Sequence, residues 1–377
     1  MSLRRLKAWE AAGLVDAATA ARIREWESSH AQPVALRAVV AIAALAIGLG
    51  LVSLIAANWD AVPGPVRLGI HFAVMAALAL WLWRGAGVIA AEAGLFVFGM
   101  LGLTFFGHVG QVYQTDSPLW QPLALWLLLF APAILLRGTG ALNALLLLVV
   151  AVVAGFSYMS WLIGMQPRLG PVEETVRIAL ALTAPVLSAA LAGWAQDRSG
   201  RRGFWRHLGR LALVYAALGA SIAAVASADG PWYRDEEATR LLWSVAVASG
   251  VLLVTALLVR AFRRDHEGRI VAGLWLGLAA VPTLAFVTSG SKIVAALLFM
   301  LLWSGIAAAA LRAGWRGVFQ AAVAIVALRL VALSFELAGD LLTSGAGLIA
   351  SGVLILGVAW AALRISRRFA PSPEARS

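Results

Sequence analysis

Long apolar runs, each close to the length of a membrane span, dominate this sequence and most constrain its fold. A run of roughly 20 apolar residues, at 1.5 Å of helical rise per residue, matches the thickness of the bilayer's hydrocarbon core. Only 13% of the residues are charged, about half of the roughly 25% found in soluble domains. A water-soluble fold could not cover its surface with so few charges. The sequence therefore predicts an all-α, polytopic integral membrane helix bundle.

We expect about twelve transmembrane helices, separated by short loops that often carry Pro, Gly or charge. The predicted spans lie near residues 38–57, 65–83, 87–110, 119–136, 141–163, 175–195, 208–228, 240–259, 270–287, 292–311, 317–336 and 344–363. The predicted organisation is a short cytoplasmic helical hairpin at 1–35, the transmembrane bundle at 36–364 and a cytoplasmic tail at 365–377.

The basic residues indicate how this bundle is oriented. With the N-terminus inside, most of the 30 Lys and Arg residues fall in cytoplasmic segments. The opposite side receives only Arg67, Arg168, Arg177, Arg234, Arg240 and Lys292. Cytoplasmic loops carry such an excess of positive charge, and adding or losing one span would destroy the asymmetry. We therefore expect a multi-pass protein of a bacterial inner membrane with both termini in the cytoplasm.

About 35 largely polar residues precede the first apolar run, so this segment does not resemble a signal peptide. Leu6 and Trp9 recur at helical spacing, Gly13 is a good helix stop and Asp16 a good N-cap for a second helix. One interpretation of this hairpin is an amphipathic cap lying on the membrane or the loops. The other is a docking module for a partner protein.

Several functional classes find no support in the sequence. Cysteine is absent, which excludes disulfides, thiol catalysis and thiolate metal sites. The net charge of +11 comes from bases in short loops between apolar runs, which argues against a nucleic-acid partner. The five histidines are scattered, and no phosphate-binding Gly-rich loop is present. We expect no cofactor, no metal and no catalytic constellation.

Three segments carry a resemblance to a known family. They are LKAWEAAGLVD at 6–16, ANWDAVP at 57–63 and GQVYQ at 110–114. Together they resemble bacterial membrane proteins grouped as domain of unknown function 2157, most clearly over the first 140 or so residues, with a more general similarity to the related domain of unknown function 4401. The resemblance implies a multi-span inner-membrane protein. It implies no activity, and no functional residues transfer from it.

Ionisable residues inside the predicted spans are the best candidates for function, because they are costly in lipid and usually face the protein interior or a wet cavity. Arg329 lies about 18 Å into its span by helical rise. Glu336 and Asp340 follow at spacings that place all three near one helical face. One interpretation is an ion pair that locks the bundle, and the other is a solute- or ion-facing site.

A second group of polar residues lies at the predicted outer ends of the first three spans. Its members are Asn58, Asp60, His108, Gln111 and Tyr113. They would act as loop caps and interfacial anchors, or they would line an outward-open pocket. His71 lies about 9 Å into the second span by helical rise, where it would form a hydrogen bond to a neighbouring helix or take part in function. Because Glu336 is about 10 Å from Arg329 along the same helix, we expect the partner of Arg329 to come from another span. Asp60 is the acidic candidate, with His71 and His108 as polar neighbours.

Two classes of function follow from these observations. The first is a permease-like protein for a small solute, whose binding residues would be Arg329, Glu336, His71, Asn58, Asp60, His108, Gln111 and Tyr113. The second is a non-transporting sensor, assembly factor or scaffold that binds a protein partner through the N-terminal hairpin. A membrane enzyme ranks third. In every case the lipid bilayer is the expected surrounding.

Overall fold

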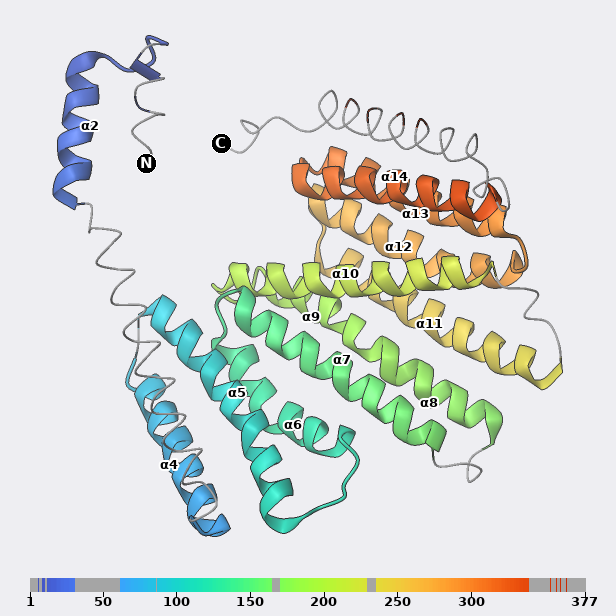
Figure 1. Cartoon of the computed structure of the whole chain (residues 1–377), viewed down its shortest axis with the longest axis horizontal. Helices are drawn as coiled ribbons and strands as arrows, with labels where there is room; N and C mark the ends of the chain where they lie inside the picture. The colour runs from blue at the N-terminus through green and yellow to red at the C-terminus, as the bar shows by residue number, and fades with distance from the viewer. Residues whose placement is uncertain are drawn as a thin grey trace. The chain divides into compact units, whose positions relative to one another are not determined.

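The computed structural model describes residues 6, 9–10, 12–30, 62–85, 87–164, 170–228 and 235–338, together with Val353, Gly357, Trp360 and Arg364. Every regular element in these residues is a helix (Figure 1). Ten of the helical segments are long and apolar enough to cross a membrane. They correspond, within a few residues at most ends, to the second to eleventh predicted spans. The first and twelfth predicted spans lie outside the continuous described segments.

The chain divides into two compact units, residues 1–69 and residues 70–377. In the first unit, Gly13 ends a helical turn with φ of 67°. The backbone N–H of Leu14 donates to the carbonyl of Trp9 at 3.0 Å, and that of Gly13 to Glu10 at 3.1 Å. This is the hydrogen-bond pattern of a Schellman cap, in which glycine is favoured because it has no Cβ. The predicted helix stop is confirmed.

The helix that follows is α2 (Ala17–His30). The side chain of Asp16 accepts a hydrogen bond from the backbone N–H of Thr19 at 3.4 Å, as the predicted N-cap residue should. This bonding to Thr19 lowers the pKa of the exposed Asp16 carboxyl. Both the helix stop at Gly13 and the N-cap at Asp16, which flank the predicted turn, are therefore present. Trp9 and Leu14 beside the turn are exposed.

The first helices of the membrane bundle are joined by short turns. They are α4 (Gly64–Trp83), α5 (Val88–Tyr113), α6 (Trp120–Arg137) and α7 (Ala141–Gly164). The buried indole of Trp126 on α6 donates to the carbonyl of Gly99 on α5 at 2.8 Å. A Cβ at Gly99 would lie 2.7 Å from Leu146 and 3.3 Å from this indole. Glycine at this position therefore allows the close approach of α5, α6 and α7.

The sixth predicted span is a broken helix. It consists of α8 (Pro171–Thr183), the short 3-10 helix η2 (Ala184–Leu187) and α9 (Ser188–Ala195). Pro185 lies in the break, where its missing N–H interrupts the α-helical ladder. The hydroxyl of Tyr215 donates to the carbonyl of Leu182 at 2.7 Å, which satisfies one acceptor next to the break. The sequence analysis did not predict this interruption.

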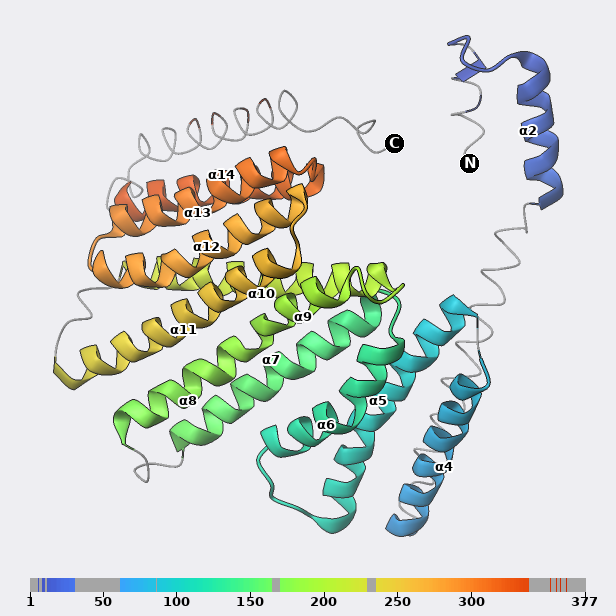
Figure 2. The same cartoon turned by 180° about the vertical axis from the view of Figure 1, so that it is seen from behind.

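The later helices are α10 (Arg202–Ala226), α11 (Asp235–Phe262), α12 (His266–Val287), α13 (Lys292–Arg312) and α14 (Arg316–Ala338). α10 contacts α7 and α9 as well as α12 and α13. Figures 1 and 2 accordingly show it between the α5–α7 group and the α12–α14 group. One hydrophobic cluster lies on each side of it, around Trp126 and around Trp275. Large side chains such as Leu128 and Ile222 are exposed, as expected where helices face lipid.

Candidate functional site

His71 and His108 form the polar contact most relevant to function within the described part of the bundle. His71 is buried on α4 and His108 is half-buried on α5. Their Nδ1 atoms lie 2.9 Å apart, and the two rings meet edge to face with centroids 4.9 Å apart. Each residue lies in the half of its helix that the sequence analysis predicted to face outward. The sequence predicted both residues as polar neighbours of Arg329, and the structure places them in contact with each other.

The geometry limits how many protons this pair holds. Nε2 of His71 lies 2.9 Å from the carbonyl oxygen of Leu101, and a carbonyl only accepts, so this nitrogen carries a proton. The contact between the two Nδ1 atoms accommodates one proton, because two N–H groups cannot point at each other. The pair therefore exists either as two neutral rings with His108 as the donor, or as one imidazolium and one neutral ring with a single proton between their Nδ1 atoms.

The local packing holds this arrangement in place. The ring of Phe105 contacts His71 edge-on, with centroids 5.4 Å apart. Thr104 donates its hydroxyl to the same Leu101 carbonyl at 3.1 Å. His108 makes a further interaction besides its bond to His71. His71 is therefore oriented by Leu101 and Phe105 on α5, and His108 by its contact with His71 on α4.

The other members of the predicted outer group are placed differently. Gln111 and Tyr113 lie on the last turn of α5, and both are exposed. Tyr113 is therefore in the position of an interfacial aromatic anchor. Asn58 and Asp60 lie outside the described residues. The structure thus brings together the two histidines and leaves the proposed role of the remaining four a prediction.

Arg329 is buried on α14, and it takes part in at least one interaction with another group. Glu336 follows on the same helix, and its side chain, like all of Asp340, lies outside the described part of the chain. α14 packs on α13, whereas α5 packs on α6 and α7. Arg329 and the histidine pair therefore belong to different groups of helices. Its predicted pairing with Asp60 stays a prediction.

Glu92 on α5 forms a polar node with the start of α7. Its carboxylate accepts from the backbone N–H of Thr139 at 2.8 Å, from the hydroxyl of Thr139 at 3.0 Å and from the backbone N–H of Asn143 at 3.2 Å. The fully buried Asn143 donates its side-chain amide back to the Glu92 carbonyl at 3.0 Å. A carboxylate from α5 thus caps the positive N-terminus of α7.

Arg201 forms the corresponding contact at the end of α6. Its guanidinium donates to the carbonyls of Leu135 at 2.7 Å and Gly138 at 3.0 Å. The cation lies over the rings of Phe204 and Trp205. Burial lowers the pKa of this Arg. Arg201 therefore satisfies carbonyls at the negative C-terminus of a helix, which indicates a structural role for a residue that the sequence assigned only to a basic loop.

The ten apolar helical segments and the exposed apolar side chains on the bundle define a multi-pass α-helical membrane protein in contact with the lipid bilayer. Residues 7–143 match the family described as "Predicted membrane protein (DUF2157)". This confirms the resemblance found in the sequence, while the relation to domain of unknown function 4401 stays a prediction. The matched stretch contains both histidines and the Glu92 node. No curated protein and no solved structure matches the chain.

Proposed function

We propose that the protein is a permease-like protein of the inner membrane, and that His71 and His108 bind a proton as part of its solute site. The observation that carries this proposal is the 2.9 Å contact between the two Nδ1 atoms inside an apolar bundle. Intramembrane histidines that face a protein partner are typical of proton pathways in transporters. Histidine is also the side chain whose charge changes most readily near neutral pH.

The pair supports coupling because it holds one proton, and the positive charge that comes with it, between α4 and α5. Protonation of the neutral pair leaves a single proton between the two Nδ1 atoms and places one positive charge on the pair. The charge held between these two helices therefore depends on the proton. A solute that binds at the predicted outer end of these helices would change the affinity for that proton, and the proton would change the affinity for the solute by the same factor.

The experiment uses the full chain in proteoliposomes that contain a pH-sensitive dye. Small-molecule fractions of a cell extract are added outside, and the internal pH is followed. We expect at least one fraction to drive acidification with the wild-type protein but not with His71→Gln or His108→Gln. His207→Gln on α10 is the matched control and should behave as wild type. Equal acidification by all four proteins, or no active fraction at all, would argue against the proposal.

A second candidate function rests on the N-terminal hairpin. Residues 1–69 cluster as a compact unit apart from the rest of the chain. Trp9 and Leu14 beside its turn are 39% and 73% exposed. Trp is enriched among the residues that anchor protein partners, and the exposed Leu14 extends the apolar surface beside Trp9. In this alternative the protein is a sensor, an assembly factor or a scaffold. Cells with Trp9→Ser and Leu14→Ser should then show the deletion phenotype while the proteoliposome signal is unchanged.

A further inference from the structure

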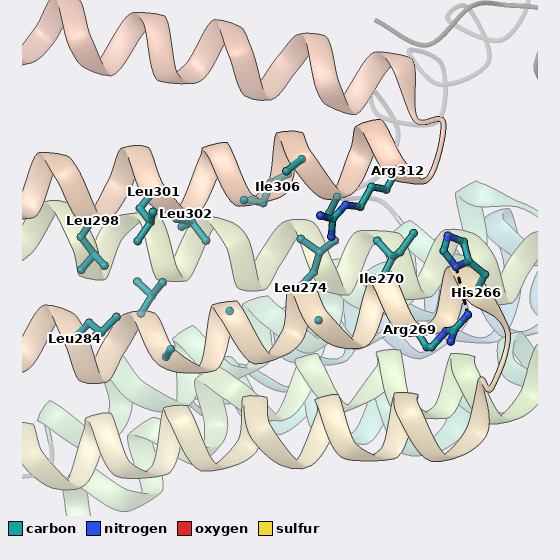
Figure 3. Close-up of a pocket in the computed structure, with 17 residues that line it drawn as sticks. His266, Arg269, Ile270, Leu274, Leu284, Leu298, Leu301, Leu302, Ile306 and Arg312 are labelled. Carbon is teal, nitrogen blue, oxygen red and sulfur yellow. Dashed lines mark hydrogen bonds between the residues drawn. The ribbon is translucent and has the colours of Figure 1, made fainter. Parts of the chain in front are cut away.

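A groove of about 820 Å³ runs between α12 and α13. Figure 3 shows leucines from both helices facing it along its length, with His266, Arg269 and Arg312 gathered at one end. The opposite face of α12 is buried in the bundle core, around Trp275 and Leu278. The groove is thus a feature of the outward side of these two helices.

Glycines make the groove deep. A Cβ added at Gly273, Gly277 or Gly305 would meet no atom within 4 Å, so all three border open space. Gly273 and Gly277 form the GxxxG pair in the sequence, a spacing that often permits close helix contact. Here the pair packs against no described helix and instead lines the cavity. The missing side chains leave room for a long, narrow apolar ligand.

Among the described residues, no acid forms an ion pair at the basic end of the groove. Arg269 and Arg312 take part in none of the ion pairs formed within the described segments. The acids closest to Arg269 in sequence, Asp265 and Glu267, each lie 3.0 Å from the guanidinium of Arg263 instead. His266 lies 3.5 Å from Arg269 and offers it only a neutral ring nitrogen. Two arginine cations therefore lie at the same end of the groove, where an anion would balance their charge.

The dimensions fit a lipid of the surrounding bilayer. From Arg269 to Leu284 along α12 is roughly 22 Å by helical rise, somewhat more than the ~15 Å depth of one leaflet. Both arginines lie at helix ends that the charge distribution assigns to the cytoplasmic surface. A phosphate between them would be at headgroup level, and an acyl chain would extend along Gly273 and Gly277 toward Leu284.

Two other possible occupants of the groove complement the positive charge of Arg269 and Arg312 less well. The predicted last span, 344–363, contains no acid, and Arg364, Arg367 and Arg368 follow it on the same predicted side. It would add positive charge beside Arg269 and Arg312. A second copy of the chain, related by an axis along the membrane normal, would place the same arginines at the same depth. Both arrangements bring like charges together.

We propose that the groove between α12 and α13 is a specific binding site for an anionic glycerophospholipid, with the phosphate held by Arg269 and Arg312 and one acyl chain against Gly273 and Gly277. The lipid site is separate from the histidine pair, so this proposal does not depend on the proposed transport function. Its position also indicates a role for lipid in holding α13 and α14 against the rest of the bundle.

Native mass spectrometry of the full chain tests this proposal, with phosphatidylglycerol and phosphatidylcholine as the two probes. We expect wild-type protein to retain one phosphatidylglycerol molecule in preference to phosphatidylcholine. The Arg269→Gln/Arg312→Gln variant should weaken this retention roughly 10- to 30-fold, from the contribution of two basic residues near a membrane surface. Arg260→Gln/Arg264→Gln removes the same charge from neighbouring positions outside the groove and should retain the lipid.

A variant that fills the groove tests the proposed binding of the acyl chain. Gly277→Leu should fill the groove and abolish retention, while Gly219→Leu, at an exposed position on α10 that also borders open space, should not. Retention that is unchanged in both groove variants would overturn the proposal. Because the chain has no cysteine, Gly277→Cys can also be crosslinked cleanly in membranes. Efficient crosslinking to a second copy, or to Leu354→Cys in the same chain, would show that protein occupies the groove and would equally overturn it.

Discussion

Replacement of Glu92 by Ala should destabilise the bundle more than any single change on its lipid-facing surface. Glu92 lies on α5, but its carboxylate accepts the backbone N–H groups of Thr139 and Asn143 at the start of α7. Both N–H groups would lose their acceptor at a position that water reaches poorly. A buried donor left without a partner costs about 1–3 kcal/mol, and loss of an N-cap about 1 kcal/mol. We therefore expect a loss of roughly 2–4 kcal/mol.

Two further variants sharpen the test. Glu92→Gln keeps an acceptor oxygen but removes the charge, so it should lose about half as much free energy of unfolding as Glu92→Ala. Gly140→Ala leaves the carboxylate in the sequence, but its Cβ would lie 2.8 Å from the Glu92 carboxylate oxygen, and it should displace this oxygen. Glu173→Gln is the matched control, because its ion pair with Arg177 is about half exposed and such pairs contribute little.

Thermal unfolding of the purified protein, followed by its tryptophan fluorescence, measures these differences. For Glu92→Ala we expect the midpoint to fall by roughly 4–8 °C, taking about 2 °C for each kcal/mol in a chain of this size. The midpoint of Glu92→Gln should fall by about half as much, and that of Glu173→Gln should stay near the wild-type value. A midpoint for Glu92→Ala within a degree or so of wild type would refute the capping role.

Three other predictions concern the N-terminal hairpin and the topology. The Asp16 carboxyl has a lowered folded pKa, so its cap is fully present above the ordinary value of 3.8 and is lost as the pH falls through the lower folded value. The hydrogen-exchange protection factors of α2 in the full chain, which correct for the intrinsic effect of pH on exchange, should therefore fall in acid for wild type but show no such step for Asp16→Asn. Deletion of residues 1–30 should leave the bundle inserted and folded, whereas degradation or aggregation would show that the hairpin is structural. Reporter fusions after residues 200 and 370 should indicate cytoplasm and a fusion after residue 234 periplasm, and a periplasmic C-terminus would be incompatible with twelve spans.

The spans were predictable from the sequence because bilayer thickness sets their length. Ten of the twelve predicted spans correspond to long apolar helices among the described residues. The hairpin turn was equally predictable, since Gly13 and Asp16 act through hydrogen bonds within a few residues of themselves. Local chemistry and membrane thickness are both visible in a single sequence.

The contacts between helices were less predictable. The sequence indicated that His71 and His108 share a depth, but depth alone could not distinguish a histidine pair from a cluster with Arg329. The partner of Glu92 is 47 residues away, at Thr139, and nothing in the spacing points to it. The GxxxG pair in α12 shows the same limit, because glycine spacing permits a close helix contact without specifying that a helix fills the space.

The central claim is that His71 and His108 share one proton through their Nδ1 atoms. Nuclear magnetic resonance of the full chain in bilayers, with ¹⁵N-labelled histidine, tests it directly because the protein has only five histidines. His71→Gln and His108→Gln assign the two signals. We predict a through-hydrogen-bond coupling between the two Nδ1 nuclei and a large change in the His71 signals in His108→Gln. Two uncoupled histidine signals, with that of His71 unchanged by His108→Gln, would contradict it.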